Sequence, residues 1–375
     1  MIDNKICEWL IENADAPVKY RVAKELIKDE KTAKKFESEL FENDVVQKWL
    51  ENLKPDNSRQ CSHNEMIHGS FDFCLENSMA KAVKLGLHAD FPQTRYAVSC
   101  YIDVMKGNYI IPYRNRHNGF STVMVANYLC FAGFDDESII EYMLGSLDEM
   151  YAFVRRGTYD IYITPKERDE LKGIPDGWKD REDFIKPELV AEYGFCYPII
   201  HDIMGLHRLY NLNNPDVDRK INAVLNYFTN DDFHTDISNG YGILTAGKRV
   251  YHSMGWSPHY PGWFDVAYYV ENSDEGSAPN GAHTENRYIP KLLSFAENIA
   301  KYPIAVKTKW FSDLLCCLEK YKIENGIYAF PKKWLTEKKG YAVGGHHLSF
   351  GENRRKKNWV EIESTFYMQL LQQNM

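Results

Sequence analysis

The chain has 375 residues, a formal net charge of −8, a hydrophobic fraction of 44% and an aromatic fraction of 14%. These values allow a sizeable core and argue against a nucleic-acid scaffold, since no basic run offsets the negative charge. No stretch approaches about 18 consecutive apolar residues, so we expect no membrane span.

The N-terminus and the cysteines indicate the cellular compartment. The first residues include Asp3, Lys5 and Glu8, which is not the pattern of a signal peptide. Eight cysteines are scattered along the chain without a small-domain framework, so we expect reduced thiols. The protein is therefore predicted to be cytoplasmic, and the sequence does not indicate an oligomeric state.

Charged and apolar positions predict helices from the start of the chain. Pro17 suits the first turn of a helix, and residues 31–47 form a charged, solvated helix. Paired helices then follow, over 71–85 and about 92–105 with Gly86 between them, and over 121–132 and about 137–154 with Gly133 between them. The last helix is predicted over Glu361–Gln372, and short β elements near Ile327–Phe330 and Tyr341–Val343.

The clearest pair of helices lies within Glu192–Phe228. Apolar residues recur at helical spacing from about Phe195 to Tyr210, around more than half of the circumference, which indicates a buried helix. Asn211 is suited to end this helix, and Asn214 to cap the next one, with Pro215 in its first turn. The second helix is amphipathic, so we expect an inner and an outer helix.

The spacing of these pairs indicates a helical repeat. Gly86 and Gly133 lie 133 − 86 = 47 residues apart, a spacing typical of two-helix repeats of about 40–47 residues. Neighbouring repeats must stack to bury their apolar faces. We therefore expect one domain over 1–375, with an irregular insertion at 156–190 and a long aromatic loop at 251–283.

Two segments resemble a known superfamily. The opening Trp9-Leu10-Ile11 followed by Ala16–Arg21 resembles that of bacterial proteins described as prenyltransferase-like or squalene-cyclase-like. Gly194-Phe195, Pro198 and Asp202 are similar to the central repeat of the same proteins. The resemblance implies an all-α fold, the α/α toroid, with inner and outer rings of helices around a central cavity.

The chemical motifs of that superfamily are only weakly represented. No D-x-D-D motif is present, and Asp135-Asp136-Glu137-Ser138 is better explained as a helix cap than as a diphosphate motif. Asp72-Phe73-Cys74 has the D-x-C spacing of the zinc site in prenyltransferase β-subunits, and Cys61, His63 and His68 lie just upstream. The three-residue pattern arises readily by chance, and a buried Cys74 in a helix is the favoured explanation, so we predict neither a metal nor another cofactor.

Three sets of residues are candidates for chemistry. Asp202 and His207 lie within the apolar arc of a buried helix, where a carboxylate must find a partner. The loop before Gly281 places histidines and an aspartate, suited to proton transfer, among aromatic residues: His252, Trp256, His259, Tyr260, Trp263 and Asp265. Near the C-terminus, glycines surround His346 and His347, and Arg354 is suited to bind an anion. For the first two sets the alternative is purely structural: an Asp202 whose hydrogen bonds are satisfied within the protein, or an aromatic plug that packs the end of the helix bundle.

Three functions remain open. The first is an enzyme that binds or converts a hydrophobic or cyclic small molecule in a central aromatic cavity, with Asp202, His252, His259 and Asp265 as the candidate catalytic residues. The second is a saccharide-active lyase or hydrolase on the same toroid. The third is a binding or scaffold protein without chemistry.

Overall fold

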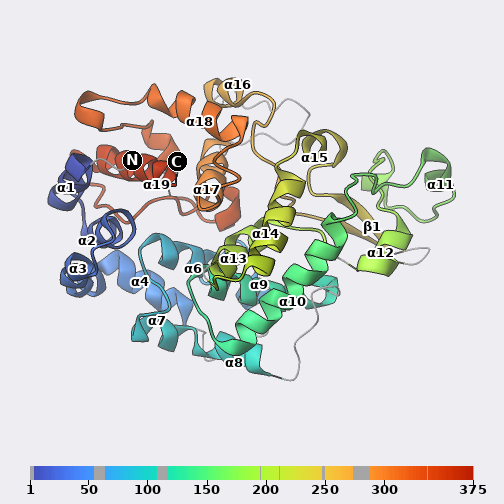
Figure 1. Cartoon of the computed structure of the whole chain (residues 1–375), viewed down its shortest axis with the longest axis horizontal. Coiled ribbons are helices and arrows are strands. Elements are labelled where there is room, and N and C mark those ends of the chain that lie inside the picture. The colour runs from blue at the N-terminus through green and yellow to red at the C-terminus, as the bar shows by residue number, and fades with distance from the viewer. Residues whose placement is uncertain are drawn as a thin grey trace.

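The computed structural model describes residues 4–54, 64–107, 116–194, 196–210, 212–246, 250–272, 288–335 and 337–374. The chain is predominantly helical, as predicted, and the two termini lie close together (Figure 1). Within the described part of the chain, every helix is too short or too polar to span a bilayer. The predicted positions Phe195, Asn211 and 273–283 lie outside the described residues.

The helices are α1 (Asn4–Asn13), α2 (Ala16–Arg21), α3 (Glu30–Glu42), α4 (Asp44–Leu53), α5 (Asn64–Ile67), α6 (Leu75–Lys84), α7 (Pro92–Ala97), α8 (Ser99–Lys106), α9 (Arg116–Phe131), α10 (Glu137–Val154), α11 (Pro165–Asp169), α12 (Pro187–Tyr193), α13 (Ile200–Tyr210), α14 (Pro215–Phe228), α15 (Asp231–Asp236), α16 (Val266–Glu271), α17 (Tyr288–Ile299), α18 (Lys309–Glu319) and α19 (Trp359–Gln372). A π-helical segment, Val22–Ile27, continues α2, and short 3-10 helices include Ala342–Gly344.

Capping residues explain several of these boundaries. Asn214 accepts hydrogen bonds from the N–H groups of Asp216 and Val217, and Pro215 opens α14 as predicted. The charged segment 31–47 was expected to be one helix, but Asn43 divides it. Its side chain accepts from the N–H groups at the start of α4, while its backbone is extended. Asn43 thus accepts from backbone N–H groups that would donate to backbone carbonyls in a continuous helix.

The inner part of the molecule is built from α6, α9, α13, α17 and α19. Contacts link α6 to α9, α9 to α13, α13 to α17, and α17 to α19, and α19 in turn contacts α1 and the π-helical segment. Figure 1 shows α6, α9 and α13 side by side in the middle of the molecule, with α10 and α14 beside them. The buried hydrophobic residues of these helices belong to one continuous core.

Helices α9 and α13 make the most extensive contact of any two helices, and a glycine permits it. A Cβ atom at Gly205 would lie 2.3 Å from Oδ1 of Asn127 and 3.0 Å from its Cα. The absent side chain therefore lets the two helices approach closely. This approach brings Asp202, near the start of α13, against Asn127 of α9.

The β structure differs from the prediction. The only sheet among the described residues pairs β1 (Gly242–Ala246) with β2 (Val250–Met254) in antiparallel register, Gly242 opposite Met254. Near the C-terminus, Tyr328 forms only an isolated bridge with Lys322, and Ala342–Gly344 is a 3-10 helix. The predicted β element at Tyr341–Val343 is therefore wrong, and that at Ile327–Phe330 is reduced to this one bridge. The apolar residues of Ile327–Phe330 pack an irregular segment into the core.

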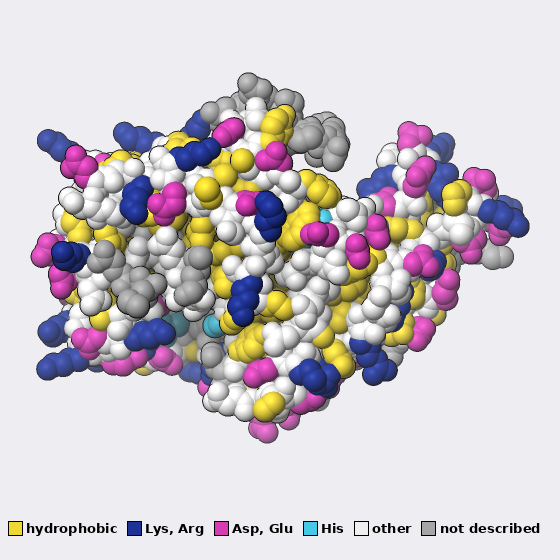
Figure 2. Space-filling model, turned by 45° about the horizontal axis from the view of Figure 1, so that its top comes forward, with side chains coloured by type: hydrophobic (Ala, Val, Ile, Leu, Met, Phe, Trp, Pro, Cys, Tyr) yellow, Lys and Arg dark blue, Asp and Glu magenta, His cyan; other side chains and the backbone are white. Residues whose placement is uncertain are grey.

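Residues 155–190 form an irregular lobe that carries α11 and α12 and projects from the helical body (Figures 1 and 2). Tyr162 and Ile185 form an isolated bridge within it, and Phe184 bridges to Ile243 of β1. Among the described cysteines, Cys100 is disulfide-bonded, so the expectation that all are reduced thiols is wrong for this residue. The other described cysteines are thiols.

A buried histidine–glutamate cluster as candidate functional site

A fully buried carboxylate lies at the start of α6. Glu76 occupies the first turn of this helix, where the helix dipole favours a negative charge, and it is 0% exposed. Its Oε1 accepts a hydrogen bond from the N–H of Gly69 at 2.7 Å. The next residue, Asn77, donates to the carbonyls of Gly69 and Phe71, which holds the preceding turn against the helix.

Two imidazoles face this carboxylate. Nδ1 of His68 lies 2.9 Å from Oε1 of Glu76, and Nε2 of His201 lies 3.7 Å from Oε2. Burial raises the pKa of Glu76, but the contacts with His201 and His68 outweigh burial, and the pKa is lowered from its ordinary value. The carboxylate therefore stays ionised between the two rings. We call these three residues the His68–Glu76–His201 cluster.

The two imidazoles differ in their access to solvent. The His68 side chain is 27% exposed, whereas that of His201 is 0% exposed. Because Nδ1 of His68 faces Glu76, Nε2 is the nitrogen left for an incoming molecule. A carboxylate that fixes the orientation of a solvent-reached imidazole is a common arrangement for proton transfer.

Aromatic rings from distant segments surround His68. The ring centroids of Phe120, Tyr341 and Trp256 lie 5.0, 5.2 and 6.3 Å from that of His68. These three side chains are all partly buried, so they form a rim and not a closed core. His201 lies behind them, 5.8 Å from Trp256. The cluster is therefore an ionised centre within an aromatic frame.

Backbone strain is found within this frame. Trp256 has a φ of 66°, a conformation that costs a side chain such as Trp about 1–3 kcal/mol. Its carbonyl accepts a hydrogen bond from the N–H of Ile200 at 2.8 Å. The aromatic loop is thereby fixed to the start of α13, one residue before His201.

The candidate Asp202 is held by two hydrogen bonds. Its Oδ2 accepts from the N–H of Ile199 at 2.8 Å, and its Oδ1 accepts from Nδ2 of Asn127 at 3.0 Å. A carboxylate in the first turn that bonds back to the N-cap N–H is half of a capping box. The side chain is 1% exposed. These contacts favour a structural role for Asp202, which fixes the helix start that carries His201.

Three loop candidates pack as an aromatic plug. Both nitrogens of His259 are engaged, Nδ1 with the Ser257 hydroxyl at 2.7 Å and Nε2 with the Ile237 carbonyl at 2.8 Å. Tyr260 is 3% exposed and contacts the ring of Trp310, while Trp263 stacks on His234 at 4.0 Å. These contacts join the loop to α15 and α18.

Two further loop candidates lie at the surface. His252 is exposed on β2, and Asp265 is exposed and caps α16 by accepting from the N–H of Tyr268 at 2.8 Å. The partly exposed His207 packs against Tyr302, and burial lowers its pKa to about 3. Of the loop candidates, the contacts described here bring only Trp256 to the His68–Glu76–His201 cluster.

The C-terminal candidates divide into a buried pair and a surface arginine. His346 and His347 are both buried, and Nδ1 of His347 lies 3.8 Å from Oε2 of Glu337. Arg354 pairs with the buried Glu363 at 3.1 Å and lies over the Trp359 ring at 3.8 Å. Arg354 thus has a carboxylate partner within the chain and is not a free anion-binding group.

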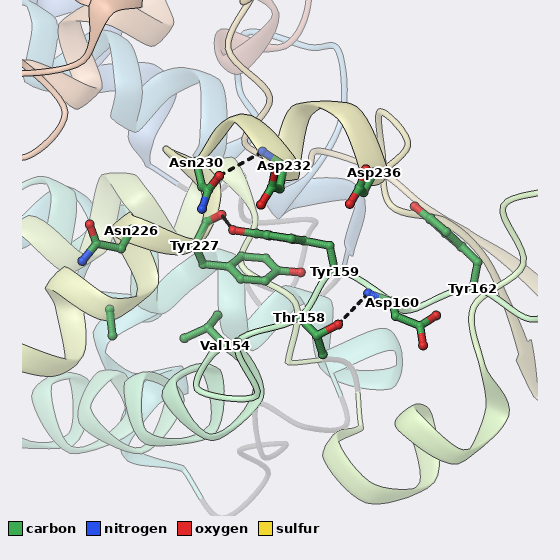
Figure 3. Close-up of a pocket in the computed structure, with 12 residues that line it drawn as sticks. Val154, Thr158, Tyr159, Asp160, Tyr162, Asn226, Tyr227, Asn230, Asp232 and Asp236 are labelled. Carbon is green, nitrogen blue, oxygen red and sulfur yellow. Dashed lines mark hydrogen bonds between the residues drawn. The ribbon is translucent and has the colours of Figure 1, made fainter.

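A large open pocket lies elsewhere, beside the 155–190 lobe. It has a volume of about 880 Å³ and is bordered by residues 157–162, α14 and α15 (Figure 3). Its walls carry the carboxylates of Asp160, Asp232 and Asp236, which are exposed. The Tyr159 hydroxyl is turned toward the protein and donates to the Tyr227 carbonyl at 2.9 Å. We refer to this pocket as the outer groove.

The zinc-like pattern has a structural place. Cys74 is buried at the N-cap of α6, and Asp72 lies 3.8 Å from Nε2 of His347. In the described part of the chain, no three His, Cys, Asp or Glu side chains are grouped closely enough to hold a metal ion. Cys61 and His63 lie outside the described residues.

The chain was compared with family models, curated proteins and solved structures, and none of them matches. The candidate site therefore rests on its own geometry. Sequence reasoning considered His68 only as a neighbour of the D-x-C pattern, and passed over Glu76. A signal was available, because three consecutive polar residues, Glu76, Asn77 and Ser78, follow the apolar Cys74 and Leu75 at the start of α6.

Proposed function

We propose that the chain is an enzyme that moves protons on a cyclic, hydroxylated small molecule at the His68–Glu76–His201 cluster. The observation that carries the proposal is a fully buried, ionised Glu76 set 2.9 Å from an imidazole that reaches solvent. In this proposal His68 accepts and returns a proton through Nε2. Glu76 positions the ring and stabilises the charged form that His68 takes up with the proton, and His201 lies against the other oxygen of Glu76.

The aromatic frame supports a saccharide-like substrate. Flat faces of Phe120, Trp256 and Tyr341 offer apolar contact with the C–H face of a sugar ring, while His68 lies among them for its hydroxyl groups. A large hydrocarbon substrate in the centre is less well supported. The cavity between α6, α13 and α17 holds about 30 Å³, whereas ligand pockets hold roughly 300–1,000 Å³.

The α/α toroid is part of the same proposal. The contacts that lead from α6 through α9, α13 and α17 to α19, and back to the N-terminal helices, support a closed ring of inner helices. The amphipathic α14 packs outside, against α10 and α13. The prenyltransferase-like resemblance supports the same arrangement. In it, the His68–Glu76–His201 cluster lies at one end of the inner ring.

A second candidate, a scaffold without chemistry, is favoured by the segment 340–347. The N–H of Ala342 donates to Oδ1 of Asn77 at 2.9 Å, and a Cβ atom at Gly345 would lie 2.2 Å from the backbone of Pro290 and Lys291. This segment packs tightly between α6 and α17 and occupies the space that a central substrate would need.

Turnover distinguishes the two candidates. The full chain would be incubated in D2O with a panel of mono- and oligosaccharides and cyclic alcohols, and NMR would follow new products and deuterium at carbon. We expect turnover with wild type, and a loss of about 100-fold or more with His68→Gln. His88→Gln is the matched control, since His88 is 24% exposed and bonded to Tyr20. No turnover across the panel, or equal turnover with His68→Gln, would favour the scaffold.

A further inference from the structure

A small cavity with charged walls lies inside the helical body. It holds about 30 Å³, enough for a water molecule or an ion of similar size, and lies between α2, α6, α13, α17 and residues 342–343. Its walls carry four basic side chains, Arg21, Lys81, Lys84 and Lys301, but a single carboxylate, Glu297. His346 also lines it, so its polar lining is predominantly basic.

Three of the four cations have partners within the chain. Arg21 forms a two-pronged pair with Glu25, at 2.6 and 2.9 Å. Lys81 pairs with Glu337 and donates to the Ser349 carbonyl at 2.5 Å. Both of these carboxylates lie outside the walls of the cavity.

The third partnered cation, Lys84, shares its carboxylate Glu297 with Arg21, whose Nη1 lies 3.8 Å from Oε1. Lys84 pairs with Glu297 and donates to the Tyr367 hydroxyl at 2.8 Å. Lys301 has no ion pair with any residue that the structure describes, and its Nζ lies 4.5 Å from the centroid of the Phe131 ring. The cavity therefore keeps about one positive charge that no carboxylate of the described residues neutralises.

Such an arrangement is costly unless something compensates for it. Lys301 and Lys84 are both partly exposed, and the partial loss of hydration lowers the pKa of each, although nearby carboxylates act in the opposite direction. A water molecule can accept one or two hydrogen bonds here but carries no charge. An anion accepts hydrogen bonds and also carries a negative charge.

We infer that this cavity binds one small monovalent anion, chloride or an ion of similar size, between Lys84 and Lys301. The volume excludes larger anions such as sulfate or a sugar phosphate. The site ties α6 to α17, so occupancy stabilises the contact between these two helices. It is independent of the proposed function, because neither lysine belongs to the His68–Glu76–His201 cluster.

Thermal unfolding of the full chain tests this inference. Melting temperatures would be measured in sodium chloride and in sodium gluconate at equal ionic strength, because gluconate is too large for the cavity. A ligand that binds only the folded state raises the melting temperature, and we expect chloride to exceed gluconate by about 2 °C or more at saturation. Equal melting temperatures in the two salts would overturn the inference.

A pair of variants localises the effect. Lys301→Met removes the unpaired ammonium and should abolish the difference between chloride and gluconate. Lys307→Met, at an exposed lysine on the segment that follows α17, should leave the difference unchanged. A full chloride effect in Lys301→Met would place the anion elsewhere and refute the site.

A structural measurement covers the case in which Lys301→Met does not fold. Crystals of wild type grown or soaked in sodium bromide should show one anomalous peak among Lys84, Lys301 and Phe131. A cavity without a peak in such crystals would contradict the inference, whatever the variants do.

Discussion

The His68–Glu76–His201 cluster and the outer groove hold their polar groups in opposite ways. In the cluster, Glu76 has lost all contact with solvent and lies against two imidazoles. In the outer groove, Asp232 and Asp236 are exposed, and water stabilises them. The groove, at about 880 Å³, offers far more room. The proposed function therefore rests on the cost of desolvating Glu76 and not on the size of a pocket.

Replacing the buried carboxylate gives the largest expected effect. Glu76→Gln keeps the shape and an oxygen for the Gly69 N–H, but removes the charge that positions His68. We expect turnover of any substrate found to fall by about 10²–10⁴-fold, with a displaced pH optimum. A change in stability without a change in the pH profile would show that Glu76 is only structural. The same readout on Asp236→Asn in the outer groove should match wild type.

The packing that supports the cluster is tested by Gly205→Ala. The added Cβ would meet the Asn127 amide, which holds Asp202. Overpacking of this kind costs about 1–3 kcal/mol, measured as a lower midpoint in urea unfolding. The control is Gly145→Ala in α10, where a Cβ meets nothing within 4 Å. There we expect a gain of about 0.5–1 kcal/mol, since Ala favours the helix.

Asp202→Asn separates two roles for that residue. Asp202 now accepts hydrogen bonds from two donors, the N–H of Ile199 and Nδ2 of Asn127. The side-chain amide of the variant has a single oxygen, so it can accept well from only one of them. We expect a loss of about 1–3 kcal/mol in the free energy of unfolding. Turnover measured well below the melting temperature should change by less than the Glu76→Gln effect. An intact fold with turnover abolished would restore Asp202 as a catalytic residue.

Acid should destabilise the protein through three histidines whose pKa is lowered in the folded state. Burial lowers the pKa of His207 to about 3, of His234 to about 3 and of His259 to about 4. The unfolded chain then binds more protons than the folded chain below about pH 6.5, so stability falls as pH falls from there toward 4. Burial raises the pKa of Glu352 to about 7, an effect of opposite sign between about pH 4.5 and 7.

Urea unfolding at several pH values measures this balance. Three histidines outweigh one glutamate, so we expect a lower unfolding midpoint at pH 5 than at pH 7. His234→Phe, which keeps a ring against Trp263, should weaken the dependence on pH. A midpoint that is constant from pH 7 to 5 would contradict the assignment of these histidines as neutral.

The smallest effect is expected in the outer groove. Asp236→Asn alters an exposed carboxylate with no ion pair among the described residues. The free energy of unfolding should change by no more than about 0.5 kcal/mol. A larger loss of stability or of turnover would show that the groove belongs to the functional machinery and would end the contrast drawn above.

Local sequence patterns predicted much of the helical structure. Asn214 and Pro215 mark the start of α14 because capping is a local interaction, readable within four residues. The buried nature of α13 also followed from its apolar arc. By contrast, the strands of β1 and β2 were missed. Their pairing depends on contacts with the 155–190 lobe, such as the bridge from Phe184 to Ile243, which no local pattern encodes.

The candidate site could be predicted only in part. Asp202 was found because one carboxylate in an apolar arc is conspicuous. Glu76, His68 and His201 come from two segments more than 120 residues apart, and their meeting depends on how α6, α9 and α13 pack. Trp256 was selected for its aromatic character, and its role as the rim of the cluster became visible only through its contact with His201.

The central claim is that His68 transfers a proton and does not merely bind. It is tested most directly by measuring turnover and affinity together in His68→Gln, with a compound that wild type converts. Affinity would be followed by tryptophan fluorescence, since Trp256 borders the site. We predict a dissociation constant within about twofold of wild type and a turnover lower by about 100-fold or more. Equal losses in affinity and turnover, or no loss in either, would contradict a proton-transfer role for this residue.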